Sequence, residues 1–244
     1  MAGNNPLGNA AKTKAVLVFS ADIQKDLARR GLNKKFAELI QIPFLNSKVT
    51  SQADVHVFST EKNLAYRSKI RNVSIHLQSG QSFGERLQRA VTKLVVSGYR
   101  QIIVVGSDCP ELQSSDISTA FEKLSNHHLV LGPDHRGGCY LIGFHAEDSH
   151  KLRGIQWQEN TDCAELQEVF GPEYTYLLSV KHDVDSIVDV QILSRCKNIW
   201  GAKAKELLQQ ENKKSHKTES SRSLIHLPTD TQRPRWQLPP PYQS

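Results

Sequence analysis

The sequence lacks a long hydrophobic run and contains little cysteine. No apolar stretch in its 244 residues reaches the roughly 18 residues of a membrane-spanning helix, so we expect no membrane span. Residues 1–13 are small and polar and lack the apolar centre of a secretory signal. The four cysteines form no CxxC pair, which favours free thiols over a metal site built from them. Together these absences predict a cytoplasmic protein.

Apolar residues are also sparse, and the positive charge is unevenly distributed. Only 38% of the residues are hydrophobic, which is low for a fully packed chain. Residues 201–244 hold eight Lys or Arg against four Asp or Glu, so they carry +4 of the net charge of +6. The preceding residues are therefore close to neutral, which gives no reason to expect a nucleic-acid partner.

Short apolar segments alternate with amphipathic helical patterns along most of the chain. We expect strands at Lys14–Ser20, Ala53–Ser59, Asn72–Leu77, Ile102–Val105, His128–Leu131 and Cys139–Phe144. We expect helices at Phe83–Val96, at Ser115–Leu124 with Ser114 or Ser115 as N-cap, and at Ile187–Cys196, and a basic loop with a helix within Leu27–Leu45. Such alternation is typical of right-handed βαβ units. The predicted fold class is α/β, a mostly parallel sheet flanked by helices.

Composition divides the chain into three parts. Residues 1–13 are expected to be a flexible N-terminus, and residues 14–200 one domain. Residues 201–244 are basic and Pro-rich, with five of the ten prolines of the chain beyond residue 227. Lys203–Gln210 can extend a helix, but from Glu211 onward too little apolar surface is present to order the chain. We expect a disordered tail.

A carboxylate follows the most apolar strand. Ile102–Val105 leads into Gly106-Ser107-Asp108-Cys109-Pro110, and open α/β sheets bind ligands outside the carboxyl ends of their strands. Asp108 is suited to hold Mg²⁺ or Mn²⁺ at the diphosphate of a nucleotide, and Ser107 to donate a hydrogen bond. Alternatively, Asp108 forms an Asx-turn before Pro110. These residues alone leave both interpretations open.

A glycine pair lies between two expected strands. The segment reads Asp134-His-Arg136-Gly137-Gly138, and paired glycines permit close approach of the backbone to a substrate. Asp134 or Arg136 can then meet phosphate or sugar hydroxyls. A plain turn that needs glycine for its geometry is the alternative.

Two acids share an extended segment further along the chain. In His182-Asp183-Val-Asp185-Ser186, residues two apart point to the same side of the backbone. Facing Asp108 across a cleft, Asp183 and Asp185 would complete a cation site. The alternative is an acidic turn that caps the helix after it.

A basic cluster follows the first strand. Its members are Lys25, Arg29, Arg30, Lys34 and Lys35. In a nucleotide-binding sheet this is where phosphates are held, so Arg29, Arg30 and the strand-ending Ser20 are candidate nucleotide-binding residues. A solvated helix face is the alternative.

Several motifs occur together in a specific order. They are Phe83-Gly-Glu-Arg-Leu87, Gly98-Tyr-Arg100, Gly106–Pro110, Leu131-Gly-Pro133, Gly137-Gly-Cys-Tyr-Leu-Ile-Gly143, Ile155-Gln-Trp157 with Thr161, and His182–Asp185. Over about residues 14–197 the chain resembles a widespread bacterial family of uncharacterised glycosyltransferase-like proteins. That family is related to guanylyltransferases of molybdenum-cofactor and deazaflavin-cofactor synthesis. The resemblance implies a GT-A-type fold.

The resemblance also implies a nucleotide-sugar or nucleoside triphosphate donor. Asp108 would be the first metal ligand and Asp185 the second, with Asp183 in support. The expected function is metal-dependent glycosyl transfer from a nucleotide-diphosphate sugar to an unidentified acceptor. A nucleotidyltransferase and a non-catalytic protein that binds a partner are the alternatives.

The sequence departs from the family pattern at two places. Many relatives carry a Gly-rich loop with Lys, Thr and Arg after the first strand, where this chain reads Ala21–Gly31 without a glycine-lined cradle. Many relatives have an acid before the glycine pair, where this chain has Arg136. Arg136 is a candidate catalytic residue together with Asp108 and Asp185, because it can bind phosphate, although it cannot act as a base.

The end of the chain contains a short recognition pattern. Leu238-Pro-Pro-Pro-Tyr242 has the Pro-Pro-x-Tyr form that WW domains bind as a polyproline helix. Packing of these residues on the protein's own surface is the alternative. The fold is also compatible with a homodimer, which no feature of the sequence requires.

Overall fold

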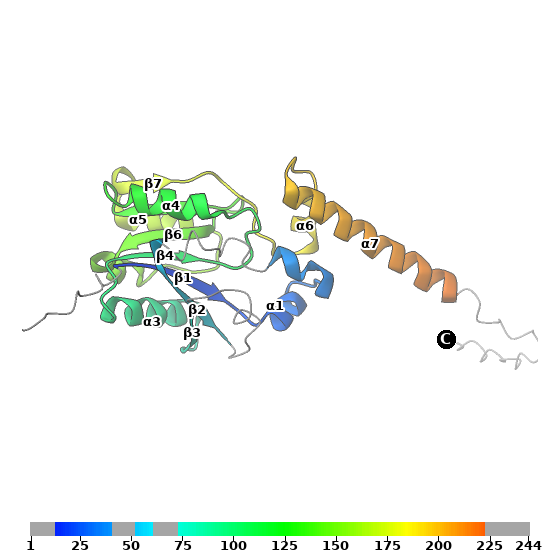
Figure 1. Ribbon diagram of the computed structural model, residues 1–244, viewed down its shortest axis with the longest axis horizontal. Coiled ribbons are helices and arrows are strands. Elements are labelled where there is room, and N and C mark those ends of the chain that lie inside the picture. The colour runs from blue at the N-terminus through cyan, green and yellow to red at the C-terminus, as the bar shows by residue number, and fades with distance from the viewer. Residues whose placement is uncertain (1–12, 41–51, 61–72, 223–244) are drawn as a thin grey trace, which may run out of the picture. The chain divides into compact units, whose positions relative to one another are not determined.

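The described residues of the computed structural model, 13–40, 52–60 and 73–222, build a seven-stranded sheet (Figure 1). Its strands are β1 (Lys14–Ser20), β2 (Asp54–Ser59), β3 (Val73–Leu77), β4 (Gln101–Val105), β5 (Leu129–Pro133), β6 (Cys139–His145) and β7 (Thr175–Leu177). The order in the sheet is β3-β2-β1-β4-β6-β5-β7. β1 is parallel to β2 and β4, β2 is parallel to β3, and β5 is parallel to β7, whereas β6 is antiparallel to β4 and β5. The predicted mostly parallel sheet is confirmed.

Helices flank this sheet (Figure 1). The α-helices are α1 (Ile23–Arg29), α3 (Phe83–Val96), α4 (Ser114–Lys123), α5 (Asp162–Phe170), α6 (Ile187–Leu193) and α7 (Ile199–Arg222). Three short 3₁₀ helices are η1 (Lys34–Leu39), η2 (Ala146–Leu152) and η3 (Pro172–Tyr174). The α/β fold class that the sequence predicts is therefore the observed one.

Neighbouring residues of the central strands enter two different hydrophobic clusters. On β1, Val16 and Val18 pack with residues of α4, whereas Ala15 and Leu17 pack with residues of α3 and α5. All four are completely buried. A strand covered on both faces needs apolar side chains at every position, which explains why its sequence shows no polar alternation.

The segment after β1 differs from the prediction. The sequence predicts a basic loop and a helix within Leu27–Leu45, but α1 and η1 occupy residues 23–39. Asp22 starts α1 because its carboxylate accepts hydrogen bonds from the backbone N–H groups of Gln24 and Lys25. The rest of the predicted helix, residues 41–45, lies outside the described residues.

Helix α4 begins one residue earlier than predicted. Its N-cap is Gln113 rather than Ser114 or Ser115. The Asp116 carboxylate accepts a 2.7 Å hydrogen bond from the Gln113 backbone N–H, so the acid in the first turn selects the start of the helix.

The chain divides into two units, Met1–Leu207 and Leu208–Ser244. The sequence predicts this boundary at residue 200. Helix α7 ends at Arg222, beyond the Lys203–Gln210 segment in which the sequence favours a helix. Residues 1–12 and 223–244, including the Pro-Pro-Pro-Tyr242 pattern, lie outside the described residues.

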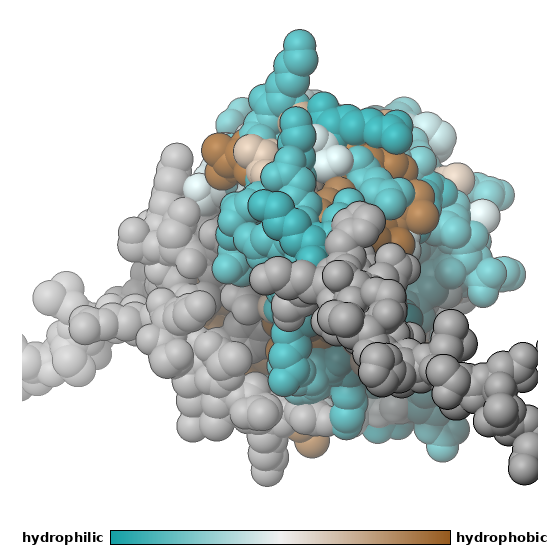
Figure 2. Space-filling view, turned by 90° about the vertical axis from the view of Figure 1, so that its right-hand side faces the viewer, coloured by the Kyte–Doolittle hydropathy of each residue, from teal (hydrophilic) through white to brown (hydrophobic). Residues whose placement is uncertain are grey.

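Polar side chains dominate the visible described surface at one end of the molecule. Figure 2 shows that the coloured residues on this face are largely hydrophilic, with smaller apolar areas between them. Among the described residues, no helix is both long enough and apolar enough to span a membrane.

Candidate active site

A cavity of about 740 Å³ opens where β1 and β4 end. Its lining comes from the segments after these two strands, from the turn after β5, and from the extended segment before α6. This is the edge of an open α/β sheet at which ligands bind. All of its lining residues belong to the Met1–Leu207 unit.

Most of the predicted site residues line this cavity. They are Ser20, Arg29, Arg30, Ser107, Asp108, Asp134, Arg136, Gly138, Asp183 and Asp185. Gly137 is not in the lining. Its α-carbon lies so close to the Asn160 carbonyl oxygen that an added Cβ would stand 2.2 Å away.

Arg30 is the centre of the polar network in the cavity. Its Nη2 lies 2.7 Å from Asp108 Oδ2, its Nη1 2.5 Å from Asp185 Oδ1, and its Nε 3.1 Å from Asp26 Oδ2. The Arg30 side chain is only 5% exposed. Burial alone would lower the pKa of Arg30, but Asp108, Asp26 and Asp185 raise it above its usual value. The guanidinium therefore stays charged and holds three carboxylates together.

Arg29 occupies a different environment from its neighbour. Its side chain is 62% exposed and pairs with Asp26 at 2.8 Å. Arg29 lines the cavity. Among the contacts of the described residues, no ion pair joins it to Asp108 or Asp185. Of the two predicted arginines, Arg30 is the one that joins the carboxylates of the site.

Arg136 approaches the same network from the turn after β5. Its Nη2 lies 2.5 Å from Asp185 Oδ2 and 3.3 Å from Asp189 Oδ2. Asp134 shapes this turn, since its Oδ1 accepts hydrogen bonds from the backbone N–H of Arg136 at 2.6 Å and of Gly138 at 3.0 Å. The turn needs the glycine pair for its geometry, and it directs the Arg136 side chain toward Asp185.

Two carboxylates in the cavity, Asp183 and Asp185, are harder to ionise than usual. Burial raises the pKa of Asp183 well above its usual value, and Asp108 adds to this effect. Burial also raises the pKa of Asp185, although Arg30 and Arg136 oppose it. Oδ1 of Asp183 is buried and accepts no hydrogen bond from any described residue. An additional cation near these acids would favour their charged form.

A backbone contact fixes the spacing of these carboxylates. The Val184 N–H donates a 2.9 Å hydrogen bond to the Asp108 carbonyl oxygen. Val184 itself is completely buried, so the acids on either side of it face the cavity. Ser107 lies beside them and contacts Ser20, with 3.2 Å between the two hydroxyl oxygens.

Aromatic side chains line another part of the cavity. The rings of Phe19 and Phe83 meet edge to face with centroids 5.2 Å apart, and Trp157 follows at 6.0 Å from Phe83. Asp162 is nearby in the lining, and burial raises its pKa to about 6. The cavity therefore combines a charged region with an apolar one.

Sequence reasoning missed several lining residues. Asp26, Arg86 and Asp162 were not among its candidates, nor were the aromatic rings, although Phe83 and Trp157 belong to its motifs. Asp26 precedes Arg30 by four residues, a spacing that pairs side chains on a helix. The Asp22 N-cap is the signal that would have revealed this helix.

Comparison with known proteins relates part of the chain to a family. Residues 45–159, slightly less than half of the chain, match a family model described as "Uncharacterized protein conserved in bacteria (DUF2064)". The match spans the Gly106–Pro110 motif and the glycine pair. It agrees with the resemblance to an uncharacterised bacterial family, whereas the link to guanylyltransferases stays a prediction. No curated protein matches the chain.

Two crystal structures share the fold. One is a proposed nucleotide-diphospho-sugar transferase from Desulfovibrio desulfuricans G20, with 22% identity and a TM-score of 0.64 over 82% of this chain and 98% of that one. The other is Rv0371c from Mycobacterium tuberculosis H37Rv, with 15% identity and a TM-score of 0.51 over 75% of this chain and 98% of that one. The chain has the α/β fold of nucleotide-diphospho-sugar transferase-like proteins.

Proposed function

We propose that this protein transfers a glycosyl group from a nucleotide-diphosphate sugar, with Mg²⁺ or Mn²⁺ in the cavity. The observation that carries the proposal is the meeting of Asp108, Asp183 and Asp185 with Arg30 and Arg136 at the carboxyl ends of the strands. Hard divalent cations prefer oxygen ligands, and a diphosphate needs cationic partners.

The three carboxylates are the residues that would hold the cation. The raised pKa values of Asp183 and Asp185 and the unpartnered Oδ1 of Asp183 fit an additional positive charge. A cation held by these carboxylates would supply charge neutralisation for the departing diphosphate. Arg136 and Arg30 supply guanidinium groups, which suit the fork geometry of phosphate oxygens.

The aromatic side of the cavity is the proposed place for the nucleobase. Phe19, Phe83 and Trp157 offer ring faces and edges of the kind on which a base packs. The distance between this side and the carboxylates would then be spanned by ribose and phosphates. The identities of the base, sugar and acceptor are not part of the proposal.

A nucleotidyltransferase is the second candidate, and it would act on a triphosphate. It is supported by the same motifs and by the family resemblance. A triphosphate requires a larger phosphate cradle than a diphosphate, and helix α1 occupies the segment where relatives carry their glycine-rich loop. This difference favours the diphosphate sugar.

Ligand-induced stabilisation distinguishes these functions. We would measure melting curves with nucleoside diphosphates, triphosphates and nucleotide sugars, each with and without Mn²⁺ or Mg²⁺. A ligand at 100 times its Kd stabilises the native state by roughly 2.7 kcal/mol. Metal-dependent stabilisation by a diphosphate or its sugar supports the transferase, whereas a response to triphosphates alone supports the nucleotidyltransferase.

No response to any nucleotide would contradict both catalytic proposals and favour a partner-binding protein. Asp108→Asn should abolish the metal-dependent response while the protein still folds. Glu122→Gln is the matched control, because it removes one carboxylate whose side chain is 74% exposed and outside the cavity lining.

A further inference from the structure

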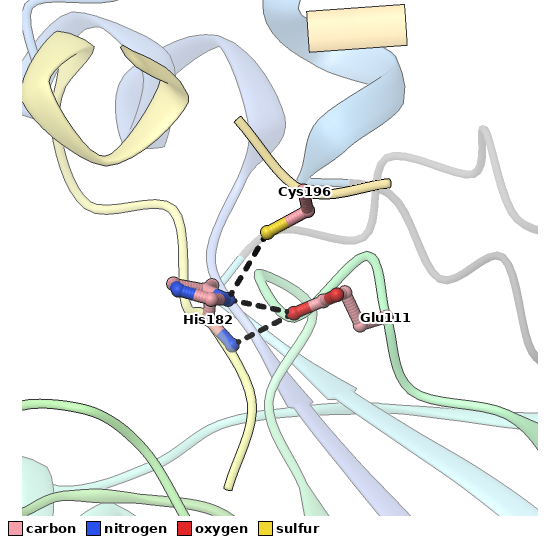
Figure 3. A group of neighbouring side chains, drawn as sticks. All are labelled: Glu111, His182 and Cys196. Carbon is pink, nitrogen blue, oxygen red and sulfur yellow. Dashed lines mark hydrogen bonds and ion pairs between the residues drawn. The ribbon is translucent and has the colours of Figure 1, made fainter. Parts of the chain in front are cut away.

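A second cluster of potential metal ligands lies outside the cavity. It contains Glu111, which follows the Gly106–Pro110 motif, His182, which precedes Asp183, and Cys196, which follows α6 (Figure 3). One ligand atom from each lies within 4.8 Å of the others. Among the described residues, the lining of the cavity includes none of the three.

The three side chains point toward one another (Figure 3). Glu111 Oε2 is 2.9 Å from His182 Nδ1, and Cys196 Sγ is 3.9 Å from the same nitrogen. Tetrahedral Zn²⁺ with bonds of about 2.0–2.3 Å places its ligand atoms roughly 3.3–3.8 Å apart. The two distances to His182 Nδ1 lie within a few tenths of an ångström of this spacing, and the Glu111 and Cys196 ligand atoms lie within 4.8 Å of each other.

The surroundings already hold two of the ligands in place. Glu111 Oε1 accepts a 2.7 Å hydrogen bond from Asn198 Nδ2, and Glu111 Oε2 accepts one from the His182 backbone N–H at 3.1 Å. The His135 ring packs on the His182 ring with centroids 3.9 Å apart. Groups that orient the ligands in this way are characteristic of metal sites.

The cluster is also accessible to an ion. The side chains of Glu111 and His182 are 16% and 21% exposed, and Cys196 is partly buried. Cys196 Sγ and Glu111 Oε2 both contact His182 Nδ1, so the three side chains converge on one point. Thiolate, imidazole and carboxylate together are a donor set for zinc.

We propose that Glu111, His182 and Cys196 bind one Zn²⁺ ion, with the fourth position open to water. The ion would connect the segment after β4, the segment before α6 and the chain after α6. It would act as a clamp behind the loops that carry Asp108 and Asp183. This proposal does not depend on the chemistry in the cavity.

Metal binding to the full chain tests the site. Protein stripped with a chelator would be titrated with ZnCl₂ against a chromogenic zinc indicator, in the presence of millimolar Mg²⁺. We expect one equivalent of tight Zn²⁺, which Mg²⁺ does not displace. Cys196→Ser and Glu111→Gln should each weaken binding by at least roughly tenfold, whereas Cys163→Ser, a control thiol, should leave it unchanged.

Cobalt identifies the ligands directly. Co²⁺ bound at this site should give a thiolate-to-metal charge-transfer band that Cys196→Ser abolishes and Cys163→Ser preserves. Equal zinc affinity in the wild type and in Cys196→Ser would overturn the proposal, as would loss of tight zinc in Asp108→Asn with retention in Cys196→Ser. Circular dichroism and melting curves would verify that each variant is folded.

Discussion

Neighbouring residues of the same chain segments build both the cavity and the Glu111–His182–Cys196 cluster. The two regions offer different donor atoms. Asp108 and Asp183 belong to the cavity, whereas Glu111 and His182 belong to the cluster. The turn after β5 also contributes to both regions. Asp134 and Arg136 line the cavity, whereas His135 packs on His182. Successive residues of an extended segment point in opposite directions, so one backbone can serve two sites.

The electrostatics of the two regions also differ. In the cavity, burial raises the pKa of Asp183 and Asp185, and Asp108 raises both further, whereas Arg30 and Arg136 oppose the rise for Asp185. In the cluster, burial alone would raise the pKa of Glu111, but hydrogen bonds from His182 and Asn198 lower it. The cavity offers oxygen donors, which suit the hard cation proposed there, whereas the cluster offers nitrogen and sulfur donors, which suit a softer one.

Removal of Arg30 should have the largest effect on the cavity. Arg30→Met leaves Asp26 and Asp108 without their buried partner, and loss of one member of a buried ion pair costs about 3–5 kcal/mol. Urea denaturation would measure the free energy of unfolding. Mn²⁺ should restore part of the loss if the carboxylates bind it.

Arg29→Met is the matched control for this variant. It removes an arginine that is 62% exposed, so its effect on stability should stay within about 1 kcal/mol. Equal destabilisation by the two variants would show that Arg30 does not organise the site.

Asp108→Asn should separate the two regions. We expect metal-dependent nucleotide binding to fall on the order of 100-fold, because even residues that only orient metal ligands contribute 10–100-fold. Isothermal titration calorimetry would measure this loss. Zinc affinity at Glu111, His182 and Cys196 should remain unchanged, and a parallel loss would mean that the two regions are not independent.

A substitution in the shared turn should affect both regions. Gly137 has φ +100°, and a Cβ there would stand 2.2 Å from the Asn160 carbonyl oxygen. Gly137→Ala should cost about 1–3 kcal/mol from backbone strain and raise the Kd for nucleotide and zinc. Gly98→Ala is the control, because Gly98 has φ +93° but no atom within 4 Å of its Cβ position. A smaller loss for Gly137→Ala than for Gly98→Ala would contradict the close packing.

Acidification should act in opposite directions on the two regions. Burial raises the folded-state pKa of Asp162 to about 6, so the native state binds protons first and gains stability as pH falls from about 6 toward 4. The pKa of Glu111 is lowered, so its contribution is present above its usual pKa and is lost as pH falls.

Unfolding curves across this pH range would compare Asp162→Asn with Glu111→Gln. We expect differences on the order of 1 kcal/mol, since both groups are partly exposed to solvent. Asp162→Asn should remove the gain on acidification, and Glu111→Gln should remove the loss. Identical pH profiles for the two variants would show that the two carboxylates do not differ in this way.

Local patterns predicted the elements that are strongly apolar or periodic. The strand Lys14–Ser20 and the helix Phe83–Val96 have the predicted bounds, because burial on both faces and an amphipathic repeat leave few alternatives. Helix α1 was missed, since its short, charged sequence has little apolar periodicity. Its start depends on a capping bond that a hydrophobic pattern does not reveal.

The sequence by itself determined the α/β class and the residue types at the ends of the strands. Asp108 was a candidate because it follows an apolar strand, Arg136 because it precedes a glycine pair and can bind phosphate, and Asp185 because it shares an extended segment with Asp183. Only the tertiary structure decided which of them meet. Arg30 contacts Asp108 and Asp185, and Cys196 approaches His182, because parallel strand order and the Val184 hydrogen bond to Asp108 bring together segments distant in the chain. Such long-range contacts follow from the sheet register, which no local pattern contains.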